Sequence, residues 1–190
     1  MTTLAQAVED LRGGDVVVIP TDTVYGLAAD CTAAADLFRL KRRPQTLALP
    51  VLAATVADLE RVAVFSASAR RIATRLWPGP LTLVLERAPS FDADLGGDGA
   101  TVAVRIPAHK LALEVLKQSG PVAVTSANRS GRPPATTVAE ARAIFSSEIN
   151  TFVDGGLCDG PPSSVVSAVG ELELLRAGAL SLEHVAQALR

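Results

Sequence analysis

Aromatic residues are scarce in this chain, with five Phe, one Trp and one Tyr among 190 residues. So few rings do not make a convincing platform on which nucleic-acid bases could stack. Lysine is also scarce, with only Lys41, Lys110 and Lys117, and the formal net charge is -2. A near-neutral chain of this kind is not expected to bind nucleic acid through its overall charge.

Cysteine and long apolar runs are nearly absent as well. Cys31 and Cys158 have no Cys or His at metal-ligand spacing, so we expect two buried or half-buried thiols and neither a disulfide framework nor a zinc site. The longest apolar run, residues 47–54, contains Pro50 and is far too short to span a bilayer. Residues 1–11 have no basic stretch and do not resemble a signal peptide. These absences predict a cytoplasmic protein without a membrane partner.

Sequence patterns for several kinds of catalysis are missing. The chain has no GxxxxGK[ST] phosphate-binding loop and no GxSxG nucleophile motif. His109 and His184 lie far apart in the sequence, and neither is paired with a candidate Ser or Cys nucleophile. Catalysis by this chain would therefore depend on positioning and charge stabilisation, and not on a covalent nucleophile.

Helical and β-rich stretches alternate along the chain, and hydrophobic residues make up 48% of it. No repeat or low-complexity linker interrupts this pattern, which predicts a single α/β domain over residues 1–190. The expected helices cover 3–12, 32–41 with Thr32 as N-cap, 56–62, 66–76, 111–118, 137–145 and a last helix capped by Ser181. The expected strands cover 15–19, 49–53, 81–85, 101–106, 122–125, 151–153, 164–169 and 172–175. The polar stretch 88–99 is either a lid or a plain hairpin connection.

Five segments carry the residues that could do chemistry. The first, residues 20–27 (Pro-Thr-Asp-Thr-Val-Tyr-Gly-Leu), follows a buried strand, where open α/β sheets bind ligands, although an ordinary turn would look the same. In the second, Lys41 and Arg43 precede Pro44. An extended chain there would place both cations on one side, where they suit a polyphosphate, whereas a helix end alone also favours cations.

The remaining three segments supply Arg105, short hydrogen-bonding side chains and glycines. Arg105 is the one charged residue in the expected strand 101–106; it needs an anionic partner if it is buried, and the alternative is an edge strand with Arg105 in solvent. Residues 125–131 include Ser126 and Asn128, which can hold phosphate or carboxylate oxygens, although capped turns are common. The glycines of 154–164 and 176–178 allow tight turns or close backbone approach to a ligand.

Together and in this order, these segments resemble the YrdC/TsaC family, the L-threonylcarbamoyladenylate synthases. The resemblance runs from about Gly13 to Gly178; the matching motifs are residues 20–27, the Lys-x-Arg of Lys41 and Arg43, the Trp-Pro-Gly-Pro-Leu-Thr of 77–82, the Val-Ala-Val-Arg of 102–105 and the Ser-x-Asn of Ser126 and Asn128. It implies a twisted, open, mixed β-sheet flanked by helices around a large positively charged groove. It also implies a nucleotidyltransferase that converts L-threonine, bicarbonate and ATP into threonylcarbamoyl-AMP and pyrophosphate. Other tRNA threonylcarbamoylation enzymes would then use the product.

The same resemblance implies roles for individual residues. Lys41 and Arg43 would be the catalytic cations that hold the ATP phosphates. The nucleotide side would be completed by Thr101, Ser126, Asn128 and Arg176. L-Threonine would be held by Thr21 or Thr23, by Ser163 and by Arg105, whose guanidinium suits a carboxylate. Mg²⁺ would arrive with ATP, because no carboxylate cluster marks a metal site of the chain's own.

The chain departs from the family pattern at two places. Residues 47–49 read Leu-Ala-Leu where the family usually has a Pro-Leu pair, often preceded by a polar or basic residue, and this change could weaken a phosphate or loop contact. Pro-Ser-Ser at 162–164 replaces Pro-Ser-Thr and keeps the hydroxyl. The first departure and the bunched arginines leave a second function open, a non-catalytic relative that binds double-stranded RNA or tRNA. The length suggests the short form of the family, without an extra C-terminal domain.

Overall fold

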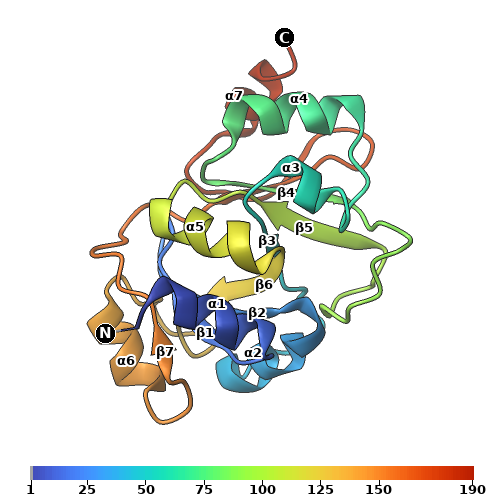
Figure 1. Cartoon of the computed structure of the whole chain (residues 1–190). Coiled ribbons are helices and arrows are strands. Elements are labelled where there is room, and N and C mark those ends of the chain that lie inside the picture. The colour runs from blue at the N-terminus through green and yellow to red at the C-terminus, as the bar shows by residue number, and fades with distance from the viewer. Residues whose placement is uncertain (1) are drawn as a thin grey trace.

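The protein folds around one mixed nine-stranded sheet, seen here in a computed structural model that describes residues 2–190 (Figure 1). The strand order is β7-β1-β2-β6-β3-β5-β4-β8-β9. The strands are β1 (Val17–Ile19), β2 (Gly26–Asp30), β3 (Val51–Leu52), β4 (Leu81–Glu86), β5 (Thr101–Arg105), β6 (Val122–Ser126), β7 (Thr151–Phe152), β8 (Ser164–Ser167) and β9 (Glu173–Arg176). The pairs β1/β7, β3/β5 and β4/β8 are parallel, and the other neighbours are antiparallel. The twisted, open, mixed sheet predicted from the sequence is therefore confirmed.

Helices flank the sheet on both faces. They are α1 (Leu4–Arg12), α2 (Ala34–Lys41, preceded by a 3₁₀ turn at Cys31–Ala33), α3 (Val56–Leu59), α4 (Ala67–Leu76), α5 (Lys110–Ser119), α6 (Val138–Phe145) and α7 (Leu182–Gln187). The helices α1 and α5 lie side by side on one face (Figure 1), where Val8 and Leu116 pack against strand residues such as Ile19 and Val124. Each such side chain that leaves water contributes roughly 1.5–3 kcal/mol to folding.

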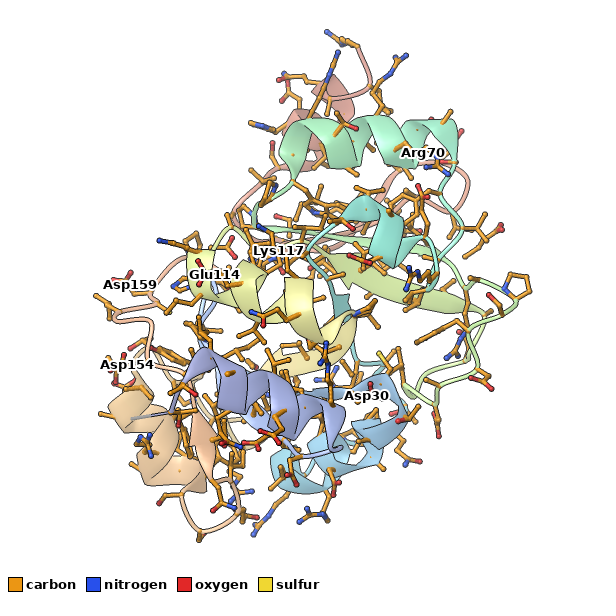
Figure 2. The ribbon with its side chains drawn as sticks, viewed as in Figure 1. Asp30, Arg70, Glu114, Lys117, Asp154 and Asp159 are labelled. Carbon is orange, nitrogen blue, oxygen red and sulfur yellow. The ribbon has the colours of Figure 1, made fainter. Side chains whose placement is uncertain are left out.

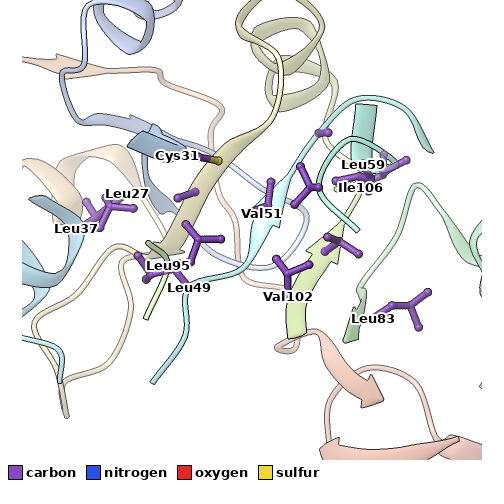
Figure 3. Close-up of a cluster of buried hydrophobic side chains, with 14 of the residues drawn as sticks. Leu27, Cys31, Leu37, Leu49, Val51, Leu59, Leu83, Leu95, Val102 and Ile106 are labelled. Carbon is purple, nitrogen blue, oxygen red and sulfur yellow. The ribbon is translucent and has the colours of Figure 1, made fainter. Parts of the chain in front are cut away.

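The larger part of the core lies on the opposite face. There Leu37 of α2 and Leu59 of α3 pack with Leu27, Val51 and Leu83 of the sheet (Figure 3). The two cysteines are free and buried, as expected. The helix α7 lies against α4, where the Arg71 and Arg75 guanidinium groups donate to the carbonyls of Leu189 and Ala188.

Three expectations about local structure are wrong. The strand β2 was not expected, because Gly-Leu-Ala-Ala-Asp has no β-branched residue. It forms because β6 pairs with all five of its residues and β1 pairs with the first three. Thr32 does not cap a helix: the Asp30 carboxylate accepts from the Thr32 amide instead, and α2 begins at Ala34. The helix expected at 56–62 ends at Leu59.

Side chains alternate between the two faces of the sheet, so one face of the central strands packs in the core and the other lines a cavity. In β5, Val102 and Val104 point into the core, whereas Thr101, Ala103 and Arg105 line a cavity. Figure 2 shows the side chains on the ribbon, with Lys117 and Glu114 labelled on α5. Within residues 2–190, no helix is both long and apolar enough to cross a membrane.

Candidate functional site

A cavity of about 680 Å³ lies over one face of β4, β5, β6 and β8. Its walls include eight of the residues singled out from the sequence: Thr21, Thr23, Arg43, Thr101, Arg105, Ser126, Ser163 and Arg176. The two others, Lys41 and Asn128, are buried directly behind Ser126 and are hydrogen-bonded to it. Five segments that are far apart in the sequence thus supply one site.

Arg105 lies inside the sheet and not at its edge, because β5 runs between β3 and β4. Its side chain is 7% exposed, and one of its terminal nitrogens is 2.6 Å from a carboxylate oxygen of Asp22. Its Nε donates to the carbonyl of Gly79 at 3.0 Å, so the 77–80 turn also fixes the guanidinium. The anionic partner that a buried Arg105 requires is therefore Asp22, and the alternative of an exposed edge arginine is wrong.

Burial and charge act on Arg105 in opposite directions. Desolvation lowers its pKa, the Asp22 carboxylate raises it, and the charge of Arg176 lowers it further. The other terminal nitrogen is 3.4 Å from the Thr23 hydroxyl, a long contact that leaves donors available on the cavity side. A planar guanidinium held in this way is suited to a carboxylate that enters the cavity.

The hydroxyls of Thr21 and Thr23 differ in availability. Thr21 Oγ1 donates to the carbonyl of Val24 at 2.6 Å and accepts from the amides of Thr23 and Val24. Its proton is therefore used to build the turn that follows β1. Thr23 Oγ1 lies 3.0 Å from Thr21 Oγ1, and its other contact is the long one from Arg105. Because the Thr21 proton is already used, the Thr23 O–H donates to Thr21 Oγ1, and Thr23 has to exchange that bond in order to donate to a ligand.

Lys41 ends α2 with its ammonium group buried at 4% exposure. Its three N–H groups donate to the Ser126 carbonyl at 2.8 Å, the Ser126 hydroxyl at 2.9 Å and the Asn128 side-chain oxygen at 2.6 Å. All three acceptors are neutral. Burial, together with the nearby charge of Arg43, lowers the pKa of Lys41 to about 8. To touch a phosphate, Lys41 has to exchange one of these bonds for it.

Arg43 reaches the cavity by a different route from the one expected. The intervening Arg42 ends α2 in the left-handed conformation, with φ 53° and ψ 45°, so the chain is not extended between the two cations. Arg43 donates from Nε to the Leu47 carbonyl at 2.9 Å and from a terminal nitrogen to the Ala48 carbonyl at 3.1 Å. Burial and the charge of Arg176 lower its pKa.

The same contacts place the unusual Leu-Ala-Leu segment in the site. Leu47 and Ala48 line the cavity, and Leu47 is half exposed. Their backbone carbonyls hold Arg43, so the contact does not depend on which side chains stand at 47 and 48. The tip of the 88–99 stretch packs on this segment, since the Leu49 amide donates to the Leu95 carbonyl at 2.8 Å. The stretch connects the antiparallel strands β4 and β5, in accord with the hairpin alternative; whether it also closes as a lid stays a prediction.

Glycines allow the segment 154–164 to lie close to the segment 20–27. The Tyr25 hydroxyl donates to the Gly156 carbonyl at 2.8 Å and accepts from the Gly155 amide at 3.0 Å. A Cβ on Gly155 would lie 2.5 Å from the Pro20 ring, so no other residue fits there without a shift. Burial raises the pKa of Tyr25 to about 12. Gly155 thus packs closely on Pro20, and the approach of these glycines to a ligand stays a prediction.

Cations outnumber anions around the cavity. Arg43, Arg105 and Arg176 line it, and no Asp or Glu does so within the described residues 2–190. Burial lowers the pKa of Arg176 too. In the same residues, no group of three or more His, Cys, Asp or Glu side chains is arranged to hold a metal ion. The arrangement suits anionic ligands, and the overall field of the groove stays a prediction.

Comparison with known proteins agrees with the resemblance found in the sequence. The sequence model of the Sua5/YciO/YrdC family, described as "Telomere recombination", matches residues 9–178. The chain belongs to this family.

Relatives within the Sua5/YciO/YrdC family differ in length. A Mycobacterium leprae protein named "Putative threonylcarbamoyl-AMP synthase" is 38% identical over 98% of this chain and 87% of its own length. The structure titled "Crystal structure of P. abyssi Sua5 complexed with L-threonine" is 36% identical with a TM-score of 0.92, and covers 97% of this chain. The chain spans only 56% of that archaeal protein. Escherichia coli YciO, at 21% identity and a TM-score of 0.87, shares the fold.

Two residues of this Sua5/YciO/YrdC site were not assigned from the sequence. Asp22 pairs with Arg105, and Thr82 of β4 lines the cavity with its hydroxyl 2.9 Å from that of Ser163. Ser163 in turn accepts from Arg176, at 2.7 Å on its carbonyl and 3.1 Å on its hydroxyl. A signal for Thr82 was present, because Leu81, Leu83 and Leu85 alternate with it and turn to the core.

Proposed function

We propose that this protein makes threonylcarbamoyl-AMP from L-threonine, bicarbonate and ATP, with release of pyrophosphate, and that it acts as a nucleotidyltransferase. The observation that carries the proposal is the convergence of the five family segments on one cavity whose charged lining residues are arginines. Family membership and relatives named for this reaction support it. The proposal places the reaction in the cytoplasm and in one domain over residues 1–190.

The amino acid would bind at the end of the cavity formed by Thr23, Arg105 and Ser163. The guanidinium of Arg105, already oriented by Asp22 and Gly79, would receive the threonine carboxylate. The ammonium group of threonine releases one proton, and the resulting amine condenses with bicarbonate, with loss of one water, to give a carbamate. Holding the amine and bicarbonate together supplies the orientation that makes this step rapid.

ATP would bind at the other end, near Lys41, Arg43 and Ser126. Thr101, Asn128 and Arg176 would complete the nucleotide side. A carbamate oxygen attacks the α-phosphorus, the bond to the β-phosphate oxygen breaks, and pyrophosphate leaves with the bonding electrons. Lys41 and Arg43 offset the charge that builds on the departing group.

Magnesium would enter with ATP and not through ligands of the chain. The carboxylates that Mg²⁺ prefers are missing from the cavity walls formed by residues 2–190. The ion would therefore be held by phosphate oxygens and water, and we assign no step to it. The product would pass to the enzymes that transfer the threonylcarbamoyl group to tRNA.

The decisive measurement is pyrophosphate release with all three substrates and with each one omitted. We expect release only with the complete set, and less with L-serine in place of L-threonine, because the lost methyl contact is worth about 1–3 kcal/mol. Pyrophosphate release that ignores threonine would refute the proposal. Binding of double-stranded RNA that weakens with salt, without any turnover, would instead favour the non-catalytic RNA-binding alternative.

A further inference from the structure

The hydroxyls of Thr82 and Ser163 form a pair whose donors can be counted. Both side chains are buried, at 5% and 6% exposure, and both line the cavity. Their oxygens are 2.9 Å apart, so one of the two O–H groups donates to the other. An arginine can only donate, and Arg176 donates to the Ser163 oxygen at 3.1 Å. Between them, the two hydroxyls therefore keep one proton that is not used within the pair.

That remaining proton has no protein acceptor among the residues 2–190 that the structure describes. The hydrogen bonds of Thr82 Oγ1 and Ser163 Oγ end with each other and with Arg176. A buried O–H donor without an acceptor costs free energy, which a ligand oxygen in the cavity would relieve. The donation from a cation to Ser163 also strengthens its O–H as a donor, because linked hydrogen bonds polarise one another.

We propose that Thr82 is a positioning residue for the amino acid: it donates to Ser163 and so turns the Ser163 O–H toward the carboxylate of L-threonine. This inference deepens the proposed function and rests on it for the identity of the ligand. When Thr82 donates, Ser163 Oγ accepts from both Thr82 and Arg176, and its own proton is left to face the cavity. Arg105 of β5 and Ser163, the residue before β8, then present donors to one carboxylate.

The test compares isosteric variants by calorimetric binding of L-threonine to the whole protein. Thr82→Val removes the donor while keeping the β-branched shape that suits a strand. We expect it to raise the Kd for L-threonine about tenfold, the loss typical of a hydrogen bond to a charged group. Thr82→Ser should restore binding to within about twofold of wild type, because it restores the hydroxyl.

A double variant separates positioning from direct contact. If Thr82 acts through Ser163, then Thr82→Val combined with Ser163→Ala binds threonine no more weakly than Ser163→Ala alone. The matched control is Thr151→Val, which removes the hydroxyl of another buried strand threonine, bonded to Asp10 at the far edge of the sheet. It should leave the Kd for L-threonine unchanged.

Several results would overturn the inference. An unchanged threonine Kd in Thr82→Val, additive effects in the double variant, or an equal loss in Thr151→Val would each do so. A larger loss of ATP affinity than of threonine affinity in Thr82→Val would also contradict it, because Arg176, which is assigned to the nucleotide side, contacts Ser163 and not Thr82. Binding needs no turnover, so these outcomes remain distinct from a wild-type protein that fails to release pyrophosphate.

Discussion

The two ends of the cavity hold their cations in different ways. At the amino-acid end, Arg105 is paired with the carboxylate of Asp22, and the two side chains are 7% and 13% exposed. At the phosphate end, the Lys41 ammonium is surrounded by neutral oxygens from Ser126 and Asn128. A charge neutralised inside the protein can fix an orientation at little cost, whereas a charge without a counterion keeps its attraction for a polyanion.

The pKa of Lys41 reflects this difference. Burial without a carboxylate lowers it to about 8, whereas Asp22 opposes the same effect at Arg105. The Lys41 ammonium at the phosphate end therefore lacks a negative counterion, which the phosphates of ATP would supply. The following changes test this comparison between the two ends.

The largest effect is expected from Lys41→Ala. It removes the uncompensated charge and the three bonds that shape Ser126 and Asn128. We expect kcat/KM for ATP to fall by about 10²–10³-fold, as for the loss of one preorganised group that stabilises transition-state charge. The measurement is initial-rate pyrophosphate release. Lys117→Ala, an exposed lysine on α5, is the control and should keep the wild-type rate. Equal rates in both variants would remove Lys41 from the site.

The second test neutralises the buried anion of the amino-acid end. Asp22→Asn leaves Arg105 buried without its counterion, and we expect it to lower the free energy of unfolding by about 3 kcal/mol. Asp36→Asn is the matched control, because its pair with Arg39 is exposed at 45% and 65%. That pair should contribute no more than about 1 kcal/mol. Urea denaturation measures both, and similar losses would contradict the buried-pair interpretation.

The pH dependence of ATP binding tests the charge of Lys41 directly. Lys41 is charged below its pKa of about 8, so ATP affinity should be constant between about pH 7, where the terminal phosphate is ionised, and pH 8, and should weaken above pH 8 by up to about tenfold per pH unit. Calorimetry without threonine avoids titration of the amino acid. Adenosine, which has no phosphate, is the control ligand and should bind equally across this range. A constant ATP affinity up to pH 10 would refute the assignment.

The same titration has a consequence for stability. The unfolded chain holds the Lys41 proton up to its ordinary pKa of 10.5, whereas the folded chain releases it near 8. Between these values the unfolded state binds more protons, so the contribution of Lys41 to the free energy of unfolding rises with pH. Below pH 8 its burial costs stability in full, which is consistent with a group retained for function.

The sequence predicted which residues gather at the cavity better than it predicted their hydrogen-bond partners. It indicated that a buried Arg105 needs an anion, but Asp22 is 83 residues away, and only the pairing of distant strands brings the two together. It predicted Lys41 and Arg43 on one side of an extended chain, but Arg42 between them adopts a left-handed conformation. Such a conformation is usually indicated by a glycine, and this position has none. The role of Thr82 was hidden because a lone threonine on a strand has many structural uses.

Most elements of the fold could also be predicted, because their apolar residues recur at helical or strand spacing. The exception, β2, shows the limit of that approach. Ala28 and Ala29 are buried on opposite faces between two other strands, so their size matters more than their strand preference. Packing between neighbours decides such a segment, and a single sequence does not display its neighbours.

The smallest effect is expected from Tyr25→Phe, which tests whether the two ends are independent. The Tyr25 hydroxyl holds Gly155 and Gly156, and this loop leads into Ser163 at the amino-acid end. Loss of these bonds should lower the free energy of unfolding by about 1 kcal/mol. Because no contact of this hydroxyl reaches Lys41 or Arg43, threonine affinity should fall more than ATP affinity. Calorimetry with L-threonine and with ATP measures both affinities. Equal losses of the two affinities would show that the two ends of the cavity respond as one unit. The paired Arg105 and the uncompensated Lys41 would then not mark two separate binding functions.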